Sequence, residues 1–99
     1  MAEKEVVILG VGVTKFGRVT GRPLMDMARE AGLMALKDAG VSPKDIQIGF
    51  CAHCYQHIGA GMEAFAELGI TGISVTNVEV ACTSESRGVL HLADTIVSE

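Results

Sequence analysis

The chain is predicted to fold as an α/β domain whose sheet is covered by helices. Three apolar or β-branched runs occur along the chain, and each is followed by a segment of helical periodicity. Such alternation favours βαβ units and a parallel sheet. Hydrophobic residues make up 48% of the 99 residues and aromatic residues only 4%, which suits a sheet buried on both faces.

The first strand and helix are predicted within residues 6–39. Residues 6–13 are apolar on both faces and predict an interior strand. Pro23 suits the first turn of a helix over residues 24–39, and Gly40 suits its end. The helix carries one apolar stripe, formed by Leu24, Met27, Ala28, Ala31, Met34 and Ala35.

Two further strands and helices follow. Strands are predicted over residues 46–52 and 73–80, and helices over residues 61–68 and 84–97. The buried face of the middle helix is predicted at Met62, Phe65, Ala66 and Gly69. The three strands in three βα units are few for an open sheet, so the fold is expected to be incomplete within this chain.

Charge, hydropathy and cysteine count restrict the partners, the location and the thiol state that are expected. The net charge of −4 and the absence of a Lys/Arg cluster argue against a nucleic acid. The charged start, Met1–Glu5, is unlike a signal peptide, and the apolar run that follows is too short to span a membrane. The chain is therefore expected to be cytoplasmic, and its three cysteines, an odd count, are expected to be free thiols.

Cys82 is the candidate catalytic residue. It lies between the β-branched run 73–80 and the helix that begins near Ser84. The dipole and the free N–H groups of a helix N-terminus favour the thiolate, which is the nucleophilic form. Thr83 or Ser84 could cap the helix. The alternative interpretation is a small buried apolar residue, the usual role of a free cysteine.

A second cluster of thiols lies at residues 51–57. Cys51-x-x-Cys54 followed by His57 has the spacing of a thiol-redox or metal-binding module. A structural zinc site needs four ligands, however, and the chain has no second pair of cysteines nearby. The alternative is that Cys51 ends a buried strand while His53, Cys54 and His57 line a loop.

Four segments together resemble the thiolase family, nearest the sterol-carrier-protein-type thiolases and the acetyl-CoA acetyltransferases. They are Val11–Gly17, the helical run Met27–Gly40, Leu68–Ile73, and Asn77–Glu79 leading into Cys82. The resemblance covers nearly all of this chain but only about the first quarter of a thiolase. It implies that residues 1–99 are the N-terminal portion of a thiolase-like domain whose C-terminal half is absent.

The resemblance implies a thiolase-type acyltransferase of lipid and fatty acid metabolism. The acyl group passes between a 3-ketoacyl-CoA or acyl-CoA and CoA through an acyl-cysteine at Cys82. CoA is a co-substrate, and no cofactor is bound permanently. The activating histidine, the second cysteine and the oxyanion residues of the family lie in its C-terminal half, so this chain alone is not expected to be active.

The resemblance also implies a homodimer or a partner chain bound through residues 73–80. An alternative function is therefore a non-catalytic interaction subunit that completes its fold on a partner. One departure from the family concerns Glu85, which stands where thiolases usually have glycine. This glutamate is either a benign acid of the first helical turn or a charge that repels a thiolate at Cys82 and alters the chemistry.

Overall fold

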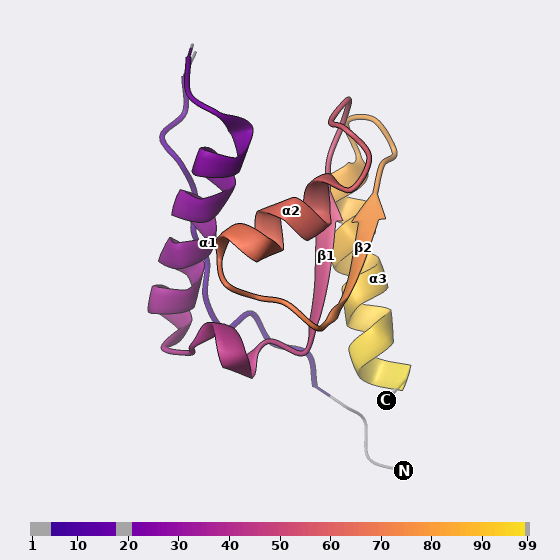
Figure 1. Ribbon diagram of the computed structural model, residues 1–99. Helices are drawn as coiled ribbons and strands as arrows, with labels where there is room; N and C mark the ends of the chain where they lie inside the picture. Colours follow the sequence, from indigo (N-terminus) through magenta and orange to yellow (C-terminus); the bar gives the residue numbers. More distant parts are fainter. Residues whose placement is uncertain (1–4, 18–20, 99) are drawn as a thin grey trace.

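A computed structural model describes residues 5–17 and 21–98 and confirms the α/β fold (Figure 1). Its elements are α1 (Leu24–Ala39), a 3-10 turn (Pro43–Asp45), β1 (Ile48–Ala52), α2 (Ala60–Glu67), β2 (Ser74–Val78) and α3 (Ser84–Ser98). The helices begin and end within one residue of their predicted bounds. The two strands lie inside the predicted runs 46–52 and 73–80 and are shorter than predicted.

The elements stack as layers in the order α1, α2, sheet, α3 (Figure 1). Strands β1 and β2 pair in parallel, with Ile48 opposite Ser74 and Ala52 opposite Val78. Helix α2 covers one face of this sheet and α3 the other, as predicted. Helix α1 packs on α2 rather than on the strands.

Helix α1 begins after Pro23 and ends at Gly40, as the sequence predicts. Gly40 has a left-handed φ of 72°, and its N–H donates to the carbonyl oxygen of Leu36 at 3.0 Å. The predicted apolar stripe is only partly covered. Leu24 and Met34 are each 45% exposed, whereas its other members, Met27, Ala28, Ala31 and Ala35, are half-buried.

Glycines bring the helices close to the sheet. A Cβ on Gly61 of α2 would lie 2.7 Å from the Cβ of Cys51, and one on Gly49 of β1 would meet the ring of Phe65. The N–H of Gly61 donates to Oδ1 of Asn77 at 2.8 Å, which ties the start of α2 to β2. This close contact fixes the layers where β1 and β2 end, which is the region that holds Cys82.

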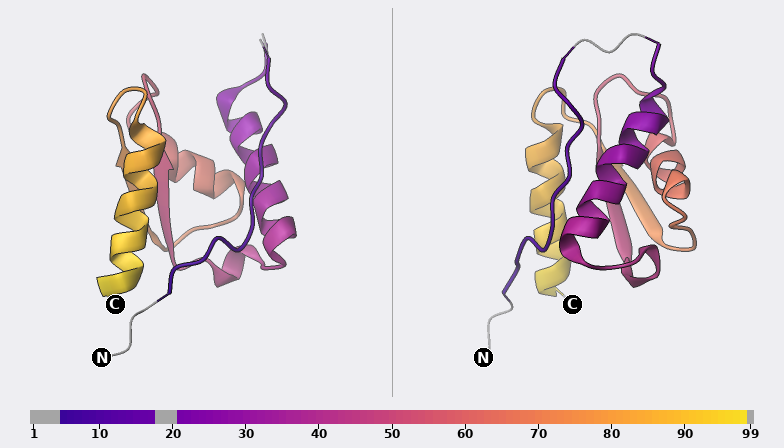
Figure 2. Two further views of the ribbon diagram at one scale, coloured as in Figure 1. Left: turned by 180° about the vertical axis from the view of Figure 1, so that it is seen from behind. Right: turned by 90° about the vertical axis from the view of Figure 1, so that its left-hand side faces the viewer.

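The predicted strand over residues 6–13 is wrong. The segment is extended but pairs with neither strand, and it runs alongside α1 (Figure 2). A Cβ on Gly12 would lie 2.2 Å from the carbonyl oxygen of Ala31, and the N–H of Val11 donates to Oδ2 of Asp38 at 3.0 Å. Gly10 and Gly12 have no side chains, and they therefore let this backbone approach α1 instead of a strand. The described sheet has two strands rather than three.

The predicted buried face of α2 is also wrong in part. Met62 is 64% exposed, and the buried residues of this helix are Ala60 and Gly61. Phe65 is half-buried, as predicted, and Ala66 is exposed. The apolar periodicity predicts that Met62 faces the sheet. The structure instead places Gly61 there, because a residue without a side chain lets α2 approach the strands closely.

Candidate functional site

Cys82 lies at a tight elbow between β2 and α3. After β2 ends at Val78, the chain turns through Ala81, which has a left-handed φ of 48°, and α3 begins two residues after Cys82. The N–H of Thr83 donates to the carbonyl oxygen of Val80 at 3.1 Å and closes the turn. Cys82 is exposed. The predicted position at a strand-to-helix join is therefore confirmed, and the alternative of a buried packing residue is wrong.

Ser84 holds this elbow against the loop that follows β1. It is 1% exposed, and its hydroxyl accepts the N–H of Val80 at 2.7 Å. The same hydroxyl lies 3.0 Å from the carbonyl oxygen of His53 and 2.8 Å from that of Ala81, and its proton is shared between them. We call this group of contacts the Ser84 clasp. It joins two loops to the first residue of α3.

The predicted helix cap takes a different form. Thr83 and Ser84 do lie at the start of α3, but their hydroxyls bind the turn that precedes the helix. The Oγ1 of Thr83 donates to the carbonyl oxygen of Val80 at 2.8 Å. Because both hydroxyls bind residues 80–81, they stabilise the elbow rather than the first free N–H groups of α3.

The loop after β1 brings Cys54 near Cys82. The N–H of His53 donates to the carbonyl oxygen of Val78 and extends the pairing of the strands by one residue. Partial burial raises the pKa of the Cys54 thiol, and so do the negative charges of Glu79, of the Cys82 thiolate and of Glu85. These charges act on Cys54 only because the elbow and the loop are neighbours.

A cavity of ≈ 630 Å³ lies between α1, β1 and α2. Glu85 enters its wall from α3. The other polar or sulfur-bearing residues of the wall are Thr14, Met25, Met27, Cys51, His53, Cys54 and Gln56. Glu85 therefore places a carboxylate at the wall of a cavity that also contains two thiols.

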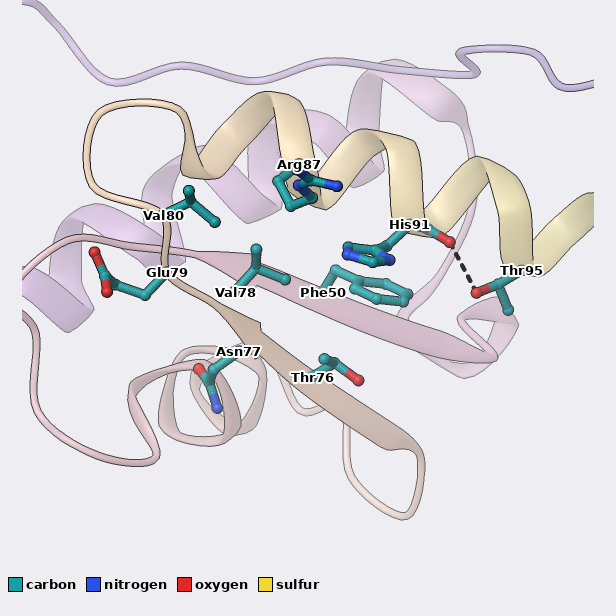
Figure 3. A pocket seen from close by; sticks show the side chains of 9 residues that line it. All are labelled: Phe50, Thr76, Asn77, Val78, Glu79, Val80, Arg87, His91 and Thr95. Atoms are coloured by element: carbon teal, nitrogen blue, oxygen red, sulfur yellow. Dashed lines mark hydrogen bonds between the residues drawn. The ribbon is translucent and has the colours of Figure 1, made fainter.

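A second hollow, of ≈ 490 Å³, lies between β2 and α3 (Figure 3). Arg87 and His91, one turn apart on α3, line it together with Phe50, Thr76 and Val78 of the sheet (Figure 3). Its walls contain no cysteine. Cys51 and Cys54 line the first cavity instead, and Cys82 lines neither of the two.

The structure gives the residues of the predicted thiol-redox or metal module different contacts. Cys51 packs beneath Gly61, and burial raises the pKa of its thiol. His57 pairs with Glu63 instead, with 2.5 Å between Nε2 and Oε2. Within residues 5–17 and 21–98, no three His, Cys, Asp or Glu side chains gather to hold a metal ion. The metal interpretation gains no support from the described residues.

The sequence did not indicate the role of His53 in the site. Its carbonyl oxygen meets the hydroxyl of Ser84, 31 residues away, and its ring Nδ1 is buried without a hydrogen-bond partner among the described residues. A serine at the start of a helix signals a local cap. No sequence signal identifies a backbone carbonyl from another loop as its partner.

Curated relatives match most of this chain, although no protein-family model does. It is 40% identical over 88 residues to non-specific lipid-transfer protein-like 2 of Caenorhabditis elegans, a match that covers 86% of this chain and 21% of that protein. It is 35% identical to an acetyl-CoA acetyltransferase of Methanocaldococcus jannaschii, over 91% of this chain and 25% of the relative. The chain thus spans about a quarter or less of the length of these curated relatives.

Solved structures share the arrangement of helices and strands. The 3-oxoacyl-[acyl-carrier-protein] synthase III of Aquifex aeolicus VF5 aligns with a TM-score of 0.70 and 19% identity, over 90% of this chain and 30% of that one. The Ltp2-ChsH2(DUF35) aldolase aligns with a TM-score of 0.63 and 25% identity, over 91% and 24% of the two chains. The chain has the thiolase-like fold and resembles part of these relatives in sequence. The resemblance inferred from the sequence motifs is confirmed.

Two further predictions for this thiolase-like chain concern its extent and location. In the part of the chain that the structure describes, no helix combines the length and the apolar character needed to cross a membrane. The cytoplasmic location stays a prediction, and so does the assignment of residues 1–99 to one N-terminal portion of a domain.

Proposed function

We propose that Cys82 is the acyl acceptor of a thiolase-type acyltransferase. The observation that carries this proposal is the exposed thiol of Cys82, held at a fixed elbow two residues before α3 begins. The similarity to acetyl-CoA acetyltransferases supports the same chemistry. In this proposal acyl-CoA and CoA are the substrates, and no cofactor is bound permanently.

The chemical step is a thioester exchange. The thiolate of Cys82 attacks the carbonyl carbon of an acyl-CoA, the bond from that carbon to the CoA sulfur breaks, and CoA leaves as a thiolate that takes up a proton. Among the described residues no side chain hydrogen-bonds to the thiol of Cys82, so a base from outside these residues must complete the cycle.

Acetylation by acetyl-CoA tests the acceptor role without requiring turnover. Mass spectrometry after digestion by Glu-C should find an added acetyl group on the peptide of residues 80–85, which contains Cys82 alone. Cys82→Ser should abolish this label, and Cys51→Ser should leave it unchanged. A label that lies mainly on Cys51 or Cys54, or that survives in Cys82→Ser, would remove Cys82 from the mechanism.

We propose a non-catalytic interaction subunit as the second candidate. Its support is the exposed apolar surface of α3, where Val89 is 67%, Leu90 51% and Val97 53% exposed, together with the second edge of β2, which pairs with no described strand. The neighbour named as an Ltp2-ChsH2 aldolase is itself named for two components. In this proposal a second copy or a partner chain binds along residues 73–80. Sedimentation of the chain as a monomer at all concentrations would argue against the second copy.

A further inference from the structure

The Ser84 clasp brings two cysteine-bearing loops together. Cys54 directly follows His53, and Cys82 directly follows Ala81. The carbonyl oxygens that precede the two cysteines both lie within 3.0 Å of the same hydroxyl oxygen. Each cysteine is therefore one residue away from a shared anchor point, although the two are separated by a helix and a strand in the sequence.

We propose that Cys54 and Cys82 form a reversible disulfide bond when the protein meets a peroxide. This pairing replaces the Cys51–Cys54 pair that the sequence spacing suggests. The bond itself does not depend on acyl transfer. Its consequence, a Cys82 that cannot accept an acyl group, rests on the proposed function.

Cys51 is the less suitable partner because it is held in the sheet. It lies opposite Asn77 in the ladder, and its Cβ packs beneath the backbone of Gly61. The ladder pairing and the contact of its Cβ with α2 therefore fix the position of Cys51 in the sheet. Cys54 lies beyond the end of β1, and Tyr55 after it adopts a left-handed φ of 67° that turns the chain.

The oxidation proceeds in two balanced steps. The exposed thiol of Cys82 loses its proton and attacks one oxygen of hydrogen peroxide, which breaks the O–O bond, releases water and leaves a sulfenic acid. The sulfur of Cys54 then attacks the sulfur of Cys82, and a second water leaves as the disulfide forms. The two thiols lose two electrons, and the peroxide gains them.

The surroundings of Cys54 and Cys82 indicate which thiol reacts first with the peroxide. Burial, Glu79, the Cys82 thiolate and Glu85 raise the pKa of Cys54, which lowers its thiolate fraction at neutral pH. Cys54 is also part-buried, whereas Cys82 is exposed. Cys82 is therefore the thiol that meets the peroxide, and Cys54 is the thiol that resolves the sulfenic acid.

Disulfide mapping of the 99-residue chain tests the pairing. Cleavage after Glu63, Glu79 and Glu85 separates Cys82, in residues 80–85, from the peptide that contains Cys51 and Cys54. After treatment with hydrogen peroxide the two peptides should appear as one linked species, lighter by two hydrogen atoms than their sum and separated again by dithiothreitol. The linked species should be lost in Cys54→Ser and kept in Cys51→Ser.

Three outcomes would overturn the proposal. They are a link that persists in Cys54→Ser, a bond between Cys51 and Cys54 within one peptide, and further oxidation of Cys82 without any link. The mapping of the unsubstituted chain requires no variant, so a folding defect in Cys54→Ser does not obscure the result. Acetylation of Cys82 is measured separately, and either proposal can fail while the other stands.

Discussion

The unit of β1, α2, β2 and α3 differs from the segment that precedes it in what holds the backbone. In this unit the two strands pair in register, glycines bring the helices against the sheet, and the Ser84 clasp joins both loops. Residues 5–17 instead contact α1 through Gly10 and Gly12, with one hydrogen bond from Val11 to Asp38 and no strand partner among the described residues.

The more apolar of the two regions is also the more exposed. Ile8 is 85% exposed and Leu9 65%, whereas the buried residues around the elbow include Val78 and Ser84, at 8% and 1%. Hydrophobic character alone therefore does not decide which part of this chain is well packed. Paired backbone groups and small side chains distinguish the region that holds Cys82.

The largest expected effect is that of Ser84→Ala. The change leaves the N–H of Val80 without its acceptor and removes the hydroxyl donor from the carbonyl oxygens of His53 and Ala81. The backbone N–H of residue 84 still donates to Ala81 at 3.4 Å. Because these groups lie around a buried hydroxyl, we expect a loss of about 2–3 kcal/mol in the free energy of unfolding, measured by urea denaturation.

Ser86→Ala is the matched control for this change. Ser86 lies in the same first turn of α3 but is exposed, so its substitution should change the free energy of unfolding by less than about 0.5 kcal/mol. Equal effects of the two substitutions would show that the clasp does not stabilise the elbow, and the contrast between the two regions would lose its main support.

A smaller and more local effect is expected from Gly12→Ala. The added Cβ would collide with the backbone of Ala31 in α1, so the segment 5–17 should leave the helix. The free energy of global unfolding should change by less than about 0.5 kcal/mol, because this segment takes no part in the sheet. Trypsin should instead cut faster after Lys15.

Val13→Ala serves as the control, since the side chain of Val13 is 60% exposed and its loss creates no collision. It should leave the rate of cleavage near that of the unsubstituted chain. If Gly12→Ala destabilised the whole domain as strongly as Ser84→Ala, the two regions would form one cooperative unit.

The smallest expected effect sharpens the comparison at the site itself. Glu85→Gln removes one of the negative charges that raise the pKa of Cys54, so the midpoint of Cys54 alkylation by iodoacetamide should move to lower pH. The midpoint of Cys51 is an internal control, because burial alone raises its pKa. An unchanged midpoint at Cys54 would mean that Glu85 lies too far away to act.

The sign of the pH dependence of stability follows from the same groups. A thiol whose pKa is raised by folding holds its proton more tightly in the folded chain than in the unfolded one. For Cys51 and Cys54 the folded state is therefore undisturbed below the ordinary pKa of a thiol and loses stability as the pH rises above it. Glu85→Gln should weaken this loss.

The sequence predicted the features that depend on local patterns. The apolar period, Pro23 and Gly40 define α1 to within a residue, and the join of a β-branched run to a helix locates Cys82. The bounds of α1 and the position of Cys82 both depend on residues adjacent in the chain, and these can be read from the sequence. The family resemblance added the acyl-transfer hypothesis but not the geometry.

The failures concern contacts between distant segments. The apolar character of residues 6–13 predicts a strand but does not indicate which surface the segment contacts. Gly10 and Gly12 allow it to lie close to α1 instead of pairing in the sheet. The hydrogen bond from Ser84 to His53 could not be predicted either, because its acceptor is a backbone carbonyl, which every residue type has. Neither feature has a pattern within its own segment.

The Ser84 clasp also has a consequence for motion. One hydroxyl anchors the elbow at Val80 and Ala81 and the neighbouring loop at His53, so the opening of either segment breaks a contact to the same side chain. The two segments should therefore fluctuate as a single cooperative unit, with the amides of Val80 and His53 exchanging with solvent through a shared opening event. Anything that binds the loop after β1 would then slow the movements of the segment that presents Cys82.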